Sequence, residues 1–253
     1  MNKNPLRLAM LISGGGSSMQ AIGLACKEGS LKGKIEPVVV ISSKVEAAGI
    51  EIAKNLGIPV EVVQRKDFEK GVRGLEAFGQ ALSTTLQKYH PDIITQNGWL
   101  PYTPKSVIDQ HEGKIFNQHP GPLDPDNLDH EGQPLHFGGK GMHGLAVHAA
   151  VLKFQQLTER KSPTEATVHR VTQKVDGGKV VFRKEVPVHL GDTPESLAKR
   201  VLPIEHECQI AFLSQFYDKK VKELKRESPL VHPGEEDKLW KAKEFARRAY
   251  PNG

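Results

Sequence analysis

The chain has 253 residues, of which 38% are hydrophobic and 26% charged, and its formal net charge is +5. This composition is typical of a folded globular protein and does not fit a disordered or fibrous chain. No apolar run is long enough to cross a membrane, and the apolar stretch near the start is too short for a secretory signal. We therefore expect a cytoplasmic protein with no membrane partner.

Most of the positive charge lies in the last part of the chain. From Lys219 onward there are ten Lys or Arg residues and six Asp or Glu residues, so the rest of the chain is nearly balanced. A nucleic-acid-binding face would combine basic with aromatic residues, whereas this tail mixes both signs of charge. We predict a solvated amphipathic helix within a basic tail, no nucleic-acid partner, and a positive field suited to small anionic substrates.

The first half of the chain alternates buried apolar runs with helical segments. Strands are predicted over residues 6–13, 35–42, 58–63, 91–99 and 114–119. Helices are predicted over 17–28, over 46–57 with Gly57 closing the helix, and over 68–89. This alternation predicts an α/β fold with a doubly wound, mostly parallel sheet.

The second half is less regular. Residues 124–141 form a turn-rich loop without a period, and a helix is expected over 144–157. Two β-like runs, 164–173 and 179–188, are expected to be neighbouring strands. A long helix follows to residue 217, with Thr193 as its N-cap. Cys26 and Cys208 lie in helical segments, match no CxxC pattern and are expected to be reduced.

A glycine-rich turn, SGGGSSMQAI, occupies residues 13–22 between the first strand and the first helix. Glycines let backbone N–H groups approach an anion, and a helix N-terminus adds positive partial charge. The turn lacks the third spaced glycine of a dinucleotide fingerprint and the lysine of a P-loop. It therefore favours a single phosphate ligand, the alternative being a tight turn that binds nothing.

The stretch IFNQHPGP over 115–122 ends a strand with two polar residues. Asn117 and His119 lie two positions apart, so their side chains point to the same face of the strand, and Pro120 stops the ladder. An amide and an imidazole at that place could stabilise the oxygen charge of an acyl-transfer reaction. The alternative is a polar strand end with a solvated histidine.

A third motif, KVDGG at 174–178, places a carboxylate before two glycines. Asp176 could belong to an ordinary turn. Beside His119, its carboxylate would favour the imidazolium and could accept protons.

The histidines of the middle region raise the possibility of a metal site. They occupy positions 111, 119, 130, 136, 143 and 148. Their spacing matches no zinc motif, so no metal is expected. No serine or cysteine lies in a recognisable nucleophile elbow, which leaves direct attack by a substrate on an acyl donor.

Taken in order, these motifs resemble those of the folate-dependent formyltransferase family over most of residues 6–215. LISGGGSSMQAI resembles the family's phosphate loop, FNQHP carries its Asn-x-His, and VTQKVDGG carries its catalytic Asp. NGWLPYTP resembles the segment before the catalytic strand, and IEHECQI the helix that offers Glu205 to a ribose. The closest branch is the one that formylates glycinamide ribonucleotide in purine biosynthesis.

The resemblance implies a Rossmann-like fold, 10-formyltetrahydrofolate as co-substrate, and a phosphorylated amine as acceptor. It implies Asn117, His119 and Asp176 as the catalytic residues. It implies a phosphate site made by Gly15, Gly16, Ser17 and Ser18, and folate contacts at Gly98, Trp99, Leu100 and Val175. The expected domain covers 1–218, with a phosphate-binding half (1–113), a catalytic and folate half (114–218) and a separate tail (219–253). The assembly is expected to be a monomer or homodimer.

The sequence also departs from the family pattern. Ser18 replaces the usual Asn, HPGPL replaces His-Pro-Ser-Leu-Leu, NGWLPYTP lacks the expected Met-Arg, and the 124–141 loop is longer. Two alternatives stay open. One is an amino-sugar nucleotide N-formyltransferase, and the other is a phosphate-binding module without catalysis.

Overall fold

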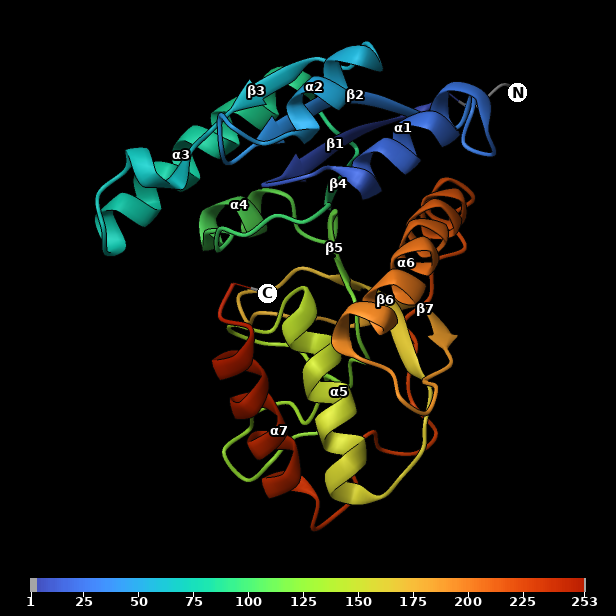
Figure 1. Cartoon of the computed structure of the whole chain (residues 1–253). Helices are drawn as coiled ribbons and strands as arrows, with labels where there is room; N and C mark the ends of the chain where they lie inside the picture. The colour runs from blue at the N-terminus through green and yellow to red at the C-terminus, as the bar shows by residue number, and fades with distance from the viewer. Residues whose placement is uncertain (1–3, 253) are drawn as a thin grey trace. The chain divides into compact units, whose positions relative to one another are not determined.

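The computed structural model describes residues 4–252, which form two compact units (Figure 1). The first unit comprises residues up to Gln118 together with Gln209–Val221, and the second comprises His119–Cys208 together with Lys222 onward. The two units together carry a mostly parallel sheet with helices, so the predicted α/β class is confirmed.

The first unit contains five parallel strands. They are β1 (Leu6–Ile12), β2 (Ile35–Ser42), β3 (Val60–Val62), β4 (Ile93–Gln96) and β5 (Ile115–His119). Their order is β3-β2-β1-β4-β5, so the direction of winding reverses between β1 and β4. In an open α/β sheet, ligands bind at the carboxyl ends of the strands where this reversal occurs.

Apolar side chains on both faces explain why β1 is a central strand. Residues Leu8 to Ile12 are completely buried, as expected for a parallel strand covered by helices. The helices of this unit are α1 (Ser17–Glu28), α2 (Gly49–Asn55), α3 (Val72–Tyr89) and α4 (Lys105–Gln110). Helix α1 packs beside α2, and α3 beside α4. The sequence prediction missed α4, whose six residues are too few to show a helical period.

The second unit contains an antiparallel pair of strands, β6 (Thr164–Arg170) and β7 (Val180–Val186), as predicted. Its helices are α5 (Leu145–Thr158), the first part of α6 (Pro194–Tyr217), and α7 (Glu236–Ala249). Thr193 caps α6 as predicted, because its side-chain oxygen accepts the N–H of Ser196 at 3.2 Å. Among the residues from 4 to 252, no helix is both long and apolar enough to cross a bilayer.

The prediction that the tail helix is solvated is wrong. Helix α7 runs beside α5 (Figure 1) and buries Leu239, Ala242 and Ala246 in a shared apolar cluster with Phe154. The tail sequence is amphipathic, as predicted, but its apolar face is covered by α5. A helix can pack against another when only one residue in three or four is apolar. The many charged residues on the other face of α7 therefore led to the wrong prediction that the helix is solvated.

Candidate active site

The glycine turn follows β1 and opens α1, in the first unit. Gly16 has φ 73°, and a side chain there would meet the Cα of Gly49 at 2.7 Å, so only glycine fits. Gly14 and Gly15 face open space. No side chain caps the first turn of α1, so its N–H groups have the arrangement that anions use at helix N-termini.

Ser13 connects this turn to the segment after β4. Its hydroxyl oxygen accepts hydrogen bonds from the Ser43 hydroxyl at 2.6 Å and from the Leu100 N–H at 2.9 Å. Segment 97–103 contains Gly98, Trp99 and Leu100, three of the residues expected to contact folate. The predicted phosphate loop therefore meets this segment at the β1/β4 reversal, within the first unit. Sequence reasoning missed Ser13 as the connecting residue, because nothing local marks a serine that bridges two loops.

The expected folate residues differ in exposure. Gly98 has φ 79° and open space around its Cα, and Leu100 and Val175 are exposed at 56% and 44%. The Trp99 ring is buried against Phe78 of α3, with ring centroids 6.2 Å apart. Its indole N–H has no hydrogen-bond partner among the residues described.

Asn117 lies on β5 in the first unit, in register with Gln96 of β4, and is partly buried. His119 ends the same strand and belongs to the second unit. Glu205, the predicted ribose contact, is buried on α6, also in the second unit.

The second unit brings His119 and Asp176 together. Nδ1 of His119 lies 3.6 Å from Oδ2 of Asp176, and both side chains are buried. Asp176 has φ 53° in the turn closed by the Gly177 N–H and the Lys174 carbonyl, a conformation that Asp tolerates better than most residues. The residue is therefore in a turn, but its carboxylate is held inside the protein.

A second histidine flanks the same carboxylate. Nε2 of His169, on β6, lies 3.3 Å from Oδ1 of Asp176, and its Nδ1–H donates to the carbonyl of Arg170 at 2.9 Å. Sequence reasoning missed His169. The only local signal for His169 is its position near the end of a predicted strand, five residues before the KVDGG motif.

The backbone of residues 136–139, at the end of the long loop, completes these contacts. The Gly139 N–H donates to Oδ2 of Asp176 at 2.9 Å, and the Phe137 carbonyl accepts Nε2–H of His119 at 3.2 Å. A side chain at Gly138 would meet Cβ of Asp176 at 2.6 Å. This glycine allows the loop to approach the carboxylate closely.

For both Asp176 and His119, burial shifts the pKa in one direction and the charge of the other residue shifts it in the opposite direction. Burial would raise the pKa of Asp176, but His119, His169 and the Gly139 N–H together hold it well below its usual range. Burial lowers the pKa of His119 to about 4, although Asp176 opposes this. The Asp176 carboxylate is therefore ionised near neutral pH, and the imidazole of His119 is neutral there.

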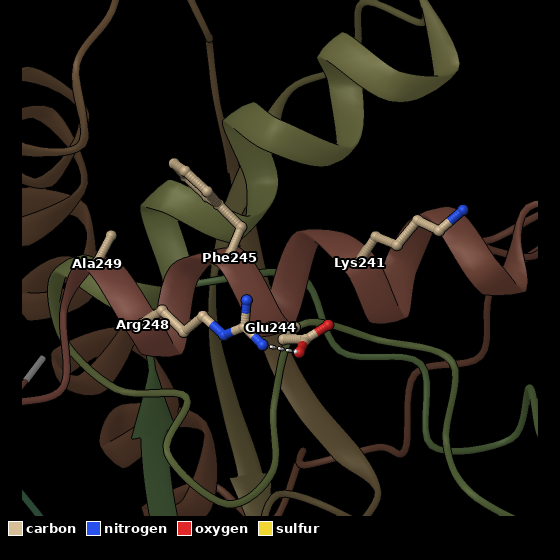
Figure 2. A pocket seen from close by; sticks show the side chains of 5 residues that line it. All are labelled: Lys241, Glu244, Phe245, Arg248 and Ala249. Carbon is tan, nitrogen blue, oxygen red and sulfur yellow. Dashed lines mark hydrogen bonds and ion pairs between the residues drawn. The ribbon is translucent and has the colours of Figure 1, made fainter.

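A surface hollow of about 430 Å³ lies over α7 and involves none of the predicted site residues. Figure 2 shows its lining side chains on one face of the helix, with Arg248 paired to Glu244. Phe245, in the same hollow, is 48% exposed and faces Nζ of Lys153 on α5 at 5.4 Å.

An α/β fold carries the glycine turn and the buried group of one carboxylate and two imidazoles, and comparison with known proteins identifies the family. The chain belongs to the formyl transferase family, whose model matches residues 6–213. The match confirms the resemblance inferred from the motifs. It ends before α7.

Relatives and solved structures carry more specific names. The chain is 33% identical over 230 residues to the chloroplastic phosphoribosylglycinamide formyltransferase of Vigna unguiculata, covering 90% of this chain and 66% of that protein. It is 29% identical to phosphoribosylglycinamide formyltransferase of Escherichia coli (strain K12), covering 86% of this chain and 90% of that protein. The structure of phosphoribosylglycinamide formyltransferase from Brucella melitensis is 32% identical, with a TM-score of 0.66, 87% of this chain covered and 100% of that chain. These similarities agree with the family assignment, and the chain spans 66% of the length of the Vigna relative and 90% of the bacterial one.

Proposed function

We propose that this enzyme transfers the formyl group of 10-formyltetrahydrofolate to the amine of glycinamide ribonucleotide. The observation that carries the proposal is the buried pair of His119 and Asp176, held by the loop backbone, in a chain of the formyl transferase family. The names of the relatives support the choice of acceptor.

The glycine turn would bind the acceptor's phosphate through Gly15, Gly16, Ser17 and Ser18. Gly16 supports this role, since its positive φ turns the chain into the uncapped start of α1. Glu205 would accept hydrogen bonds from the ribose hydroxyls.

The folate would bind at Gly98, Trp99, Leu100 and Val175. The exposed apolar side chains of Leu100 and Val175 suit a flat aromatic ring, and Gly98 leaves backbone accessible. The buried indole N–H of Trp99 lacks a partner in the described chain and could donate to a ligand atom.

In the proposed reaction the amine attacks the formyl carbon, the oxygen becomes negative, and the bond from that carbon to the folate nitrogen breaks. Asn117 donates an N–H to the oxygen. His119 exchanges its hydrogen bond with the Phe137 carbonyl for one to the same oxygen and becomes the imidazolium that neutralises it. The attacking amine releases one proton, which Asp176 accepts and passes to Nδ1 of His119. This step forms the imidazolium, which Asp176 supports, and the same proton returns through Asp176 to the folate nitrogen as it leaves.

The direct test is to mix the purified protein with 10-formyltetrahydrofolate and either glycinamide ribonucleotide or amino-sugar nucleotides. We expect formylated glycinamide ribonucleotide and tetrahydrofolate in equal amounts, and no product with amino-sugar nucleotides. Formylation of an amino-sugar nucleotide alone would contradict the proposed acceptor and support the alternative branch of the family.

A further inference from the structure

A cation from the C-terminal helix reaches the loop that holds the catalytic pair. Nζ of Lys243, on α7, donates to the carbonyl of Gly138 at 2.6 Å and to the carbonyl of His136 at 3.1 Å. The side chain is buried, with only 4% of the residue exposed. A buried ammonium group needs such acceptors, because leaving water without them is very unfavourable.

The backbone of residues 136–139 contacts both Lys243 and the catalytic pair. The carbonyls of His136 and Gly138 accept hydrogen bonds from Lys243. The Phe137 carbonyl accepts one from His119, and the Gly139 N–H donates one to Asp176. The Gly138 carbonyl and the Gly139 N–H belong to one planar trans peptide unit and point in opposite directions. Holding the Gly138 carbonyl therefore fixes the direction of the N–H that binds Asp176.

We propose that Lys243 is a positioning residue for formyl transfer, and that the C-terminal segment thereby completes the active site through the backbone of residues 136–139. The inference rests on the function proposed above. It assigns a role to α7, which lies beyond residue 213, where the match to the family ends.

The charge of Lys243 also acts on the catalytic pair. The pKa of Lys243 is lowered to about 8, mainly by burial and also by the charge of Arg247, with Asp176 opposing the shift. Lys243 in turn lowers the pKa of His119 and of His136. The charged or titratable groups around His119 are Asp176, His169, His136, His148 on α5, and Lys243.

A purely structural lysine would stabilise the protein without affecting the chemistry. To separate the two roles we compare Lys243→Met, which removes the charge and the donors, with Lys243→Gln, which removes the charge but keeps an N–H donor. The control is Lys241→Met, since Lys241 is on the exposed face of the same helix.

For Lys243→Met we expect kcat to fall at least tenfold while KM for both substrates changes less than about threefold, because a positioning residue acts on the transition state. Lys243→Gln should recover part of kcat. Lys241→Met should behave like the parent. Parental kcat in folded Lys243→Met, or loss of folding in both Lys243 variants, would overturn the proposal.

Two measurements do not depend on turnover. Hydrogen exchange of the Gly139 amide should accelerate at least tenfold in Lys243→Met, and NMR titration should show a raised pKa for His119. Unchanged exchange and an unchanged pKa would overturn the proposal. If the parent formylates no acceptor while both measurements change as expected, the proposed function fails and the structural link from Lys243 to the pair stands.

Discussion

At the scale of single residues, the site depends on a buried carboxylate that faces two imidazoles and a backbone N–H. Asp176 stays ionised because these groups compensate for its burial. The sequence indicated His119 and Asp176 because each stands in a short motif with a turn beside it. It could not indicate the contacts of His136 or Lys243, because these depend on how the long loop and α7 fold back. For His169 the only local signal was its place at the end of a strand before KVDGG.

Asp176→Asn keeps the size of the side chain but removes its charge. The pKa of His119 should fall below its value of about 4, because Asp176 is the group that raises it most. Under the proposed mechanism, kcat should drop about 10²- to 10⁴-fold, as is common when an acid–base group is lost, with little change in substrate binding. Steady-state kinetics and an NMR titration of His119 measure both effects.

The same experiment has a clear contrary outcome. If Asp176→Asn retains the parental kcat over the whole pH range, Asp176 serves only the turn. Asp129→Asn is the control, since that carboxylate accepts backbone N–H groups in an exposed turn of the same unit.

At the scale of elements, the sequence predicted the strands and most helices because their apolar periods are strong. The strand predicted over 6–13 and the helix predicted over 17–28 agree with β1 and α1 to within one residue. Predictions were less accurate where a segment has too few residues or too many charges. Helix α4 has six residues, and α7 buries an apolar face within a strongly charged segment.

The cap of α6 gives a stability prediction at this scale. Thr193→Ala removes the side-chain acceptor for the Ser196 N–H and should lower the free energy of unfolding by about 1 kcal/mol. Urea unfolding measures the change. Ser228→Ala, at an exposed loop position, is the matched control and should change stability by less than about 0.5 kcal/mol. Equal effects of the two substitutions would show that Thr193 does not cap the helix.

At the scale of the whole molecule, buried histidines make stability depend on pH. Burial lowers the pKa of His119 and of His148 to about 4 each, below the ordinary value of 6.5. The unfolded chain therefore binds more protons below about pH 6.5, and the free energy of unfolding should fall as the pH drops from there towards about 4. Each unit of pKa difference corresponds to about 1.4 kcal/mol.

Urea unfolding at about pH 7.5 and about pH 5 tests this dependence. His148→Leu should reduce the loss of stability between the two conditions, because it removes one buried group that must take up a proton. His130→Leu should keep the parental loss, since the His130 ring is exposed. A parental pH dependence in His148→Leu would mean that His148 does not contribute.

The two units carry different parts of the proposed chemistry. The first has the glycine turn, Asn117 and the 97–103 segment, and the second has the buried pair and the loop that α7 supports. The proposed function needs both sets of residues. The central claim is therefore that phosphate recognition and formyl transfer belong to one reaction of this chain.

The most direct test compares glycinamide ribonucleotide with the unphosphorylated glycinamide riboside as acceptors, with 10-formyltetrahydrofolate as donor. We expect kcat/KM to be at least about 100-fold higher for the ribonucleotide, because the phosphate would form several charge-assisted hydrogen bonds with the glycine turn. Equal kcat/KM values for the two acceptors would contradict the account.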